Sequence, residues 1–92
     1  MESNIQSKII KHLKSRGAYV FKTIVTNRNG VPDVIFCLGG KFVAFEIKDA
    51  KNESTSLQEW NRKEIIKAGG HAFEIRTLEE AKVALKSIEI KH

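Results

Sequence analysis

The pair Gly39-Gly40, set between the apolar runs 33–38 and 41–48, places the strongest constraint on how this chain folds. Glycine accepts positive φ at both central positions of a two-residue turn, so the pair predicts a β-hairpin. Leu38 then faces Lys41, and the two residue numbers of every cross-strand pair in this register add up to 79. The turn therefore predicts that Asp33 lies directly opposite Glu46.

Two carboxylates on directly opposed positions repel each other, because their Cβ atoms lie roughly 5 Å apart. Lys48 follows Glu46 by two residues and so points to the same side of the sheet. A divalent cation bound between Asp33 and Glu46 removes the conflict, and Mg²⁺ or Mn²⁺ favours such oxygen ligands. The alternative is that Lys48 only forms a salt bridge with Glu46.

Such a metal would polarise a phosphoryl oxygen and lower the pKa of a coordinated water. Lys48 would orient the attacking water or stabilise the negative charge that develops. The hairpin therefore favours phosphodiester hydrolysis as the chemistry of this chain.

Composition narrows the class of protein. With 92 residues and no long linker or repeat, residues 1–92 are expected to form a single domain. The net charge of +5 favours a polyanionic partner. No apolar run is long enough to span a bilayer, and the N-terminus does not resemble a signal peptide, so we expect an intracellular protein, cytoplasmic or nucleoid-associated, with no membrane partner. The single cysteine, Cys37, excludes an internal disulfide and is expected to fill space on its strand.

Three capping boxes mark the expected helices, at Ser3-Gln6, Ser56-Glu59 and Thr77-Glu80. The first helix is expected over 3–16, the second from 56 to the stop at Gly69-Gly70, and the third from 77 onward. Strands are expected over 18–24, in both arms of the hairpin and over 71–75. The order is αβββαβα, and a strand-helix-strand crossover joined to a hairpin predicts a mixed four-stranded sheet in an α/β fold.

Both faces of the hairpin are apolar, so the sheet is expected to be covered by helices on both sides. The inner face of the second helix is expected to hold Leu57, Trp60, Asn61, Ile65 and Ala68. The inner face of the third is expected to hold Leu78, Ala81, Leu85 and Ile88.

The residues Pro32-Asp33 and Glu46-Ile47-Lys48 resemble the signature of the PD-(D/E)xK nuclease superfamily. Within it the chain is most similar to the VRR-NUC family, which is related to Holliday junction resolvases. The resemblance covers most of the chain and implies a restriction-endonuclease-like core. It also implies that Asp33, Glu46 and the carbonyl of Ile47 hold Mg²⁺ or Mn²⁺, and that Lys48 assists the nucleophile.

Two further residues fit the family pattern. Glu2, near the first helix, would contribute to the metal site directly or through water, and Gln58 would support the site from the second helix. Each has a simpler interpretation: Glu2 is an acidic residue favoured near a helix N-terminus, and Gln58 is a solvated polar side chain. Trp60 is expected to pack and not to stack on bases.

Basic residues supply the expected phosphate contacts, and Lys22, Arg28, Lys48 and Lys51 are expected to cluster around the metal site. Arg28 is favoured because guanidinium binds phosphate in a bidentate manner. No motif for base edges is present, which favours an enzyme that recognises DNA shape. We therefore expect a metal-dependent endonuclease that resolves four-way junctions as a homodimer. The alternatives are cleavage of flaps or other DNA structures, or a nucleic-acid-binding module with an inactive metal site.

Overall fold

A computed structural model describes residues 4–49 and 51–89 and has the expected order of elements, αβββαβα. The helices are α1 (Asn4–Ser15), α2 (Ser56–Lys67) and α3 (Leu78–Ile88), and the strands are β1 (Tyr19–Lys22), β2 (Val34–Leu38), β3 (Lys41–Ile47) and β4 (His71–Ile75). The strands form one mixed sheet in the order β1-β2-β3-β4, in which only β3 and β4 are parallel. The predicted α/β fold with a restriction-endonuclease-like arrangement is confirmed.

The hairpin has the register that the glycine turn predicts. Gly39 and Gly40 both have positive φ, and the pairs run from Leu38 opposite Lys41 to Val34 opposite Phe45. Asp33 and Glu46 are the next residues along the two strands, and the same register places them opposite each other.

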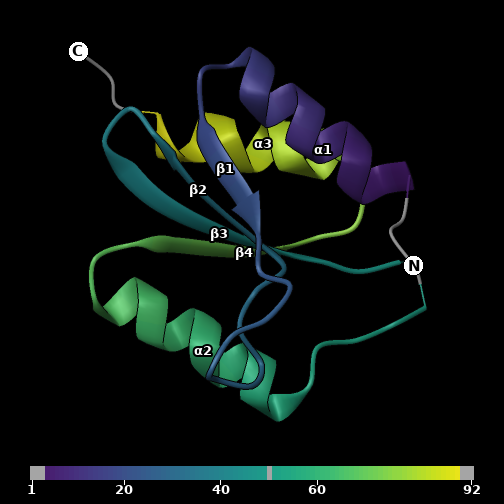
Figure 1. The fold of residues 1–92 in the computed structure, drawn as a ribbon, viewed down its shortest axis with the longest axis vertical. Helices are drawn as coiled ribbons and strands as arrows, with labels where there is room; N and C mark the ends of the chain where they lie inside the picture. Colours follow the sequence, from purple (N-terminus) through teal and green to yellow (C-terminus); the bar gives the residue numbers. More distant parts are fainter. Residues whose placement is uncertain (1–3, 50, 90–92) are drawn as a thin grey trace.

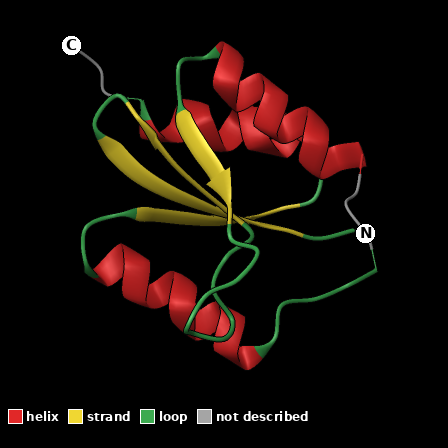
Figure 2. Ribbon diagram, in the orientation of Figure 1, coloured by secondary structure: helices red, strands yellow, loops and turns green. Residues whose placement is uncertain are grey.

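The sheet lies between two layers of helix (Figures 1 and 2). The main core fills the space between the sheet and the layer formed by α1 and α3. Phe36 and Phe45 pack edge to face there with their ring centroids 4.9 Å apart, and Phe73 continues the contact. This packed face holds β3 in place and therefore also holds the charged residues at its end.

The first strand is shorter than the predicted 18–24 because the chain leaves the sheet after Lys22. The Thr23 hydroxyl donates to the carbonyl of Pro32, while Ile24 and Val25 are 80% and 89% exposed. These two residues favour β structure locally, but they have no neighbouring strand to pair with. Helix α1 also ends one residue earlier than predicted, and Ser3, the expected cap, lies outside the described residues.

The predicted cap of α2 is wrong by one residue. Thr55 caps the helix from extended backbone and forms a capping box with Gln58, whereas the residue pattern predicts Ser56 and Glu59. At α3 the Thr77 cap is confirmed, but Glu80 accepts from the backbone of Arg76, so the expected reciprocal bond to Thr77 is not made. Adjacent polar residues satisfy the same cap pattern, and the backbone decides between them.

Helix α2 is the element whose inner face the sequence predicted least well. Only Asn61 is buried, whereas Leu57 and Trp60 are about half exposed and Ala68 is exposed. The apolar stripe of α3 is confirmed, with Ala81, Leu85 and Ile88 buried and Leu78 packed against the core.

The expectation that helices cover both faces of the sheet is also wrong in part. Helix α2 packs beside β4, and Cys37 and Phe42 on the same face remain exposed. Cys37 is therefore not a buried filler.

Candidate metal and phosphodiester site

The ends of β2 and β3, the start of α1 and the first turn of α2 meet around a pocket of about 370 Å³. Its lining includes five of the predicted site residues, namely Asp33, Glu46, Ile47, Lys48 and Gln58. Ile5 and Gln6 of α1, together with Asp49 and Asn52 of the following loop, complete it. The fold thus brings together residues that lie up to 53 positions apart in the sequence, from Ile5 to Gln58.

The loop that delivers Asp33 rests directly on α2. The Asn61 side chain donates to the carbonyl of Asn29 at 3.1 Å, which explains why this polar residue is buried. Gly30 has a φ of +79°, and a Cβ at this position would lie 2.6 Å from Cγ of Leu57. Glycine is therefore needed both for the turn and for the close approach to α2.

Asp33 is fixed by the backbone of the opposite strand. Its Oδ2 accepts a hydrogen bond from the Ile47 N–H at 3.0 Å. This bond orients the carboxylate across the strand pair toward Glu46.

Glu46 is 2% exposed and its two carboxylate oxygens have different surroundings. Oε2 accepts from Nε2 of Gln58 at 3.1 Å and lies 3.6 Å from Nζ of Lys48. Oε1 is buried and has no hydrogen-bond partner among the described residues. A buried oxygen without a hydrogen bond lowers the stability of the fold. Within the described residues, the surroundings of Glu46 leave this acceptor unsatisfied.

Burial raises the pKa of Glu46 from 4.5 to about 7. The neighbouring Asp33 carboxylate adds to the rise, and Lys48 opposes it. The like-charge conflict that the hairpin register predicts is therefore present in the structure, and Lys48 compensates it only in part.

Gln58 has two functions in the structure. Its Oε1 accepts from the Thr55 N–H at 3.0 Å as part of the helix cap, and its Nε2 donates to Glu46. The amide is thus fixed at both ends, and the helix cap sets the direction in which Gln58 approaches the carboxylate.

A second glutamate lies beside Glu46 and behaves differently. Glu74 pairs with Glu46 in the parallel register of β3 and β4, and it receives a hydrogen bond from Ser54 at 2.7 Å and ion pairs from Arg62 and Arg76. The hydrogen bond from Ser54, and then Arg76, lower the pKa of Glu74. Glu74 is therefore a saturated structural carboxylate.

The Glu74 cluster was not found from the sequence. Arg76 also donates to the carbonyl of Asp49, so the cluster ties the loop that follows Lys48 to the edge strand. Its members come from α2, from β4 and the residue that follows it, and from the loop before α2, and the packing of α2 against β4 brings them together. Nothing in their spacing signals the contact.

The other predicted residues lie apart from this pocket or outside the described chain. Arg28 stands over the ring of Trp60, 6.0 Å from its centroid, and lines a different groove. Lys22 borders a shallow depression beside α1, and Lys51 is exposed on the loop before α2. Of the four basic residues expected to cluster, only Lys48 lines the pocket. Glu2 lies outside the described residues.

Comparison with solved structures gives the fold a name. One, described as a "VRR_NUC domain", superimposes with a TM-score of 0.80 over 92% of this chain and 94% of its own, at 20% identity. A second, a "VRR_NUC domain protein", gives a TM-score of 0.65 over 95% and 89%, at 13% identity. The chain has the VRR_NUC fold. No protein-family model and no curated protein sequence matches it.

In this VRR_NUC fold, residues 4–49 and 51–89 contain no group of three or more His, Cys, Asp or Glu side chains placed to hold a metal ion. Within that part of the chain, Asp33 and Glu46 therefore offer two candidate acidic ligands and not a complete metal cage. A pair suits Mg²⁺, which keeps several waters and commonly takes one or two protein carboxylates.

We expect replacement of Gln58 by leucine to weaken Mn²⁺ binding by about 10- to 100-fold, because Glu46 would lose the donor that orients it. Isothermal titration of Mn²⁺ into the protein measures the affinity. Glu59→Gln, in the same exposed first turn of α2, is the matched control and should bind as the wild type does. Equal affinities for Gln58→Leu and wild type would show that Gln58 serves the helix cap alone.

Proposed function

We propose that this chain is a metal-dependent, structure-selective DNA endonuclease that hydrolyses phosphodiester bonds. The observation that carries the proposal is the free, buried Oε1 of Glu46, which lies beside Asp33 in a pocket and has no protein partner among the described residues. The VRR_NUC fold, whose solved examples are named for a nuclease domain, supports it.

The donor set fits a hard divalent cation. Asp33 and Glu46 would hold Mg²⁺ or Mn²⁺, with the carbonyl of Ile47 and, directly or through water, Glu2 as the further ligands that the family resemblance implies. When bound, the cation would supply Lewis-acid polarisation of a phosphoryl oxygen and a more acidic water.

The remaining residues act through position and charge. Lys48 has a side chain 14% exposed with its ammonium 3.6 Å from Glu46, so it is held at the pocket and still reaches solvent. From there Nζ would donate to the attacking water or to the phosphate oxygen on which negative charge develops. Gln58 keeps Glu46 in place while the charge on the substrate changes.

The basic residues outside the pocket would contact the DNA backbone. Lys22, Arg28 and Lys51 come from three separate segments, which suits an extended polyanion better than a small phosphate ligand. Phosphate contacts position a duplex without reading its sequence. Selection of the substrate would thus depend on the shape of the DNA.

We further propose four-way junctions as the preferred substrate and a homodimer as the active form, in DNA repair and recombination inside the cell. A two-fold dimer presents two equivalent pockets at a fixed separation, as paired incision of a symmetric junction needs. No helix in the described part of the chain is long and apolar enough to cross a membrane.

The test is a cleavage panel on linear, flap and four-way DNA with Mg²⁺, Mn²⁺ or EDTA. We expect metal-dependent nicking, with four-way DNA cut fastest, and no cleavage in EDTA. Preferential cutting of flaps would support the nuclease proposal and contradict the proposed preference for four-way junctions. Binding to branched DNA without cleavage of any substrate in either metal would contradict the enzyme proposal and favour a binding module.

A further inference from the structure

Helix α1 differs from the other two helices in its charge. Its sequence, Asn4–Ser15, contains three lysines and a histidine and no Asp or Glu. Helices α2 and α3 both carry acidic and basic side chains together. A solvated helix gains from mixed signs, because like charges three or four positions apart repel and opposite charges attract. The lysines of α1 therefore indicate a negatively charged partner and not only contact with water.

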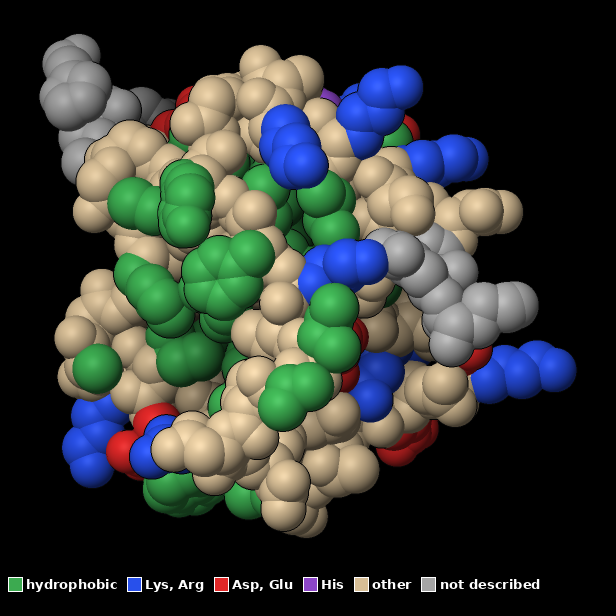
Figure 3. Space-filling view, in the orientation of Figure 1, with side chains coloured by type: hydrophobic (Ala, Val, Ile, Leu, Met, Phe, Trp, Pro, Cys, Tyr) green, Lys and Arg blue, Asp and Glu red, His purple; other side chains and the backbone are tan. Residues whose placement is uncertain are grey.

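Two of these lysines border a shallow depression of about 360 Å³. Ser7, Lys11 and Lys14 of α1 line it together with Lys22 of β1, and Ile10 adds an apolar part. We call Ser7, Lys11, Lys14 and Lys22 the lysine track. Figure 3 shows Lys and Arg side chains gathered over α1, at the top of that view.

Lys11 and Lys14 are not neutralised by the rest of the described chain. Both are exposed, and no ion pair among the described residues includes either of them. Arg16, just past the end of the helix, does have such a partner in Glu89. The two lysines stand three positions apart, where like charges destabilise a helix. An anion bound by both would remove this repulsion.

The lysine track begins where the metal pocket ends. Gln6 of α1 lines the metal pocket, and the next residue, Ser7, lines the depression. On the sheet, Lys22 pairs with Val34, the residue that follows Asp33. A polyanion that leaves the pocket along α1 would therefore meet the track directly.

The spacing of the lysines suits a DNA strand. Lys11 and Lys14 are separated by three residues, which is about 4.5 Å along the helix axis. One strand of a duplex carries a negative charge roughly every 3.4 Å of the duplex axis. The two flexible ammonium groups can therefore contact neighbouring phosphates, and the Ser7 hydroxyl can donate to a further phosphate oxygen.

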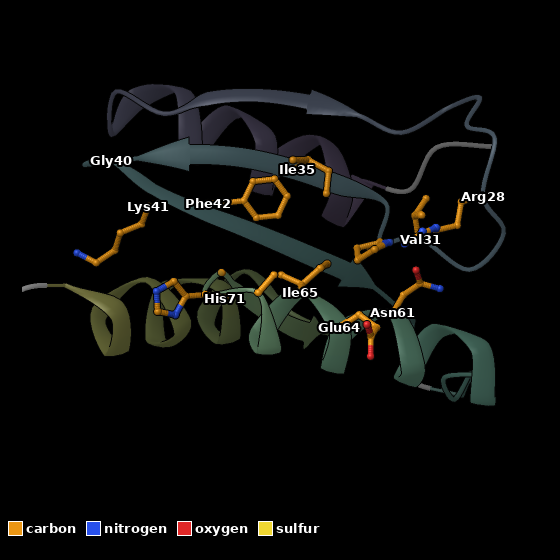
Figure 4. Close-up of a pocket in the computed structure, with 14 residues that line it drawn as sticks. Arg28, Val31, Ile35, Gly40, Lys41, Phe42, Asn61, Glu64, Ile65 and His71 are labelled. Atoms are coloured by element: carbon orange, nitrogen blue, oxygen red, sulfur yellow. The ribbon is translucent and has the colours of Figure 1, made fainter.

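A larger groove, of about 950 Å³ between the hairpin and α2, suits a phosphate backbone less well. Ile35, Phe42 and Ile65 point into it, whereas Arg28 and Lys41 stand at its opposite ends (Figure 4). Its centre is therefore apolar and offers no continuous positive charge. It also has no lining residue in common with the metal pocket.

We propose that the lysine track binds the backbone of the DNA strand that passes the metal pocket. The inference rests on the proposed nuclease function and adds Ser7, Lys11 and Lys14 to its phosphate contacts. Helices α1 and α2 lie on opposite sides of the sheet (Figure 1), so the track and Arg28 do so as well. DNA bound by both would be held on each side of the metal pocket.

The test is the affinity for DNA in EDTA, where no bond is cut, so the measurement does not depend on catalysis. Fluorescence anisotropy of labelled linear and four-way DNA at several salt concentrations gives Kd and its salt dependence. Replacing Lys11 and Lys14 together with glutamine should raise Kd on the order of 10- to 100-fold near 0.1 M salt. It should also lower the slope of log Kd against log salt by about 2.

Two further double variants serve as controls. Lys82→Gln with Lys86→Gln removes two exposed lysines from α3, in the same helical layer, and should leave Kd and slope near the wild-type values. Lys11→Arg with Lys14→Arg keeps both charges and should bind DNA as the wild type does. Glutamine and lysine have similar helix propensities, and circular dichroism checks that each variant is folded.

The outcomes separate this proposal from the nuclease function. If the glutamine variant had the Kd and slope of the wild type, the track would be contradicted even though both proteins cut DNA. An equal loss in the α3 control would contradict it too. Weaker binding by the glutamine variant of a protein that never cuts DNA would support the track and contradict the nuclease. Unchanged DNA affinity with lost binding of polyglutamate would assign α1 to an acidic protein and overturn the proposal.

Discussion

Replacing Glu46 with glutamine is expected to lower metal-dependent cleavage of DNA by at least about 10³-fold, equivalent to about 4 kcal/mol of transition-state stabilisation. Glutamine has the same size and still offers one oxygen to Gln58, but it cannot carry the negative charge that a cation requires. Single-turnover cleavage of the best substrate in the panel measures the loss. DNA affinity in EDTA should not fall, because the carboxylate repels phosphate.

Asp33→Asn should have an effect of similar size for the same reason. An asparagine oxygen can still accept the hydrogen bond from the Ile47 N–H, so the strand ends should stay in register. Glu79→Gln removes an exposed carboxylate from the first turn of α3, on the other face of the sheet, and serves as the control. If either site variant cut DNA at the wild-type rate, the carboxylate pair would not be the metal site.

The grouping of residues in the candidate site could be predicted from the sequence because local backbone geometry determines it. A Gly-Gly turn fixes the hairpin register, and the two-residue period of a strand then decides which side chains share a face. These two rules placed Asp33, Glu46 and Lys48 together without any knowledge of the rest of the fold. The structure has the same register between residues 34 and 45.

The other features of the candidate site depend on packing between segments that are distant in the sequence. The sequence could not show that Gln58 serves the cap of α2 and Glu46 together, because that requires the position of α2 over β3. Because of the position of α2, Trp60 also lies half exposed beside Arg28, and Phe42 is not covered. Periodicity shows that a helix has an apolar side, but not how much of a sheet that side covers.

The contrast between Glu46 and Glu74 is also invisible in the sequence. Both glutamates stand in apolar strands, at paired positions of β3 and β4. Two arginines and a serine satisfy Glu74, whereas Glu46 has one amide donor and one more distant ammonium. The charge of Glu74, the structural carboxylate, is therefore compensated, whereas the charge of Glu46, the candidate metal ligand, is not.

That uncompensated charge makes folding stability depend on pH. The pKa of Glu46 is about 7 in the folded chain and 4.5 as its ordinary value, so the native state binds this proton more tightly than the unfolded state. The contribution is fully present below pH 4.5 and is lost as the pH rises through 7. The free energy of unfolding should then fall by up to about 3 kcal/mol across this window.

Urea unfolding at a series of pH values between 4.5 and 8, without divalent ions, measures the slope. Glu74 does not offset it, because its pKa is lowered and its contribution is lost only at more acidic pH. Glu46→Gln should flatten the slope and exceed the wild type in stability at pH 8, while it loses cleavage. An unchanged slope in Glu46→Gln would show that Glu46 does not cause it.

Divalent cations should restore the folding stability that is lost as the pH rises. A cation that binds only the folded protein stabilises it by mass action, by about 2.7 kcal/mol at a concentration 100 times its dissociation constant. At pH 8 millimolar Mn²⁺ should therefore raise the melting temperature of the wild type and leave that of Glu46→Gln unchanged. The bound ion would then relieve the repulsion between the two carboxylates that destabilises the metal-free fold. The same ion would supply the proposed chemistry, so metal binding would link the stability of this domain to its proposed activity.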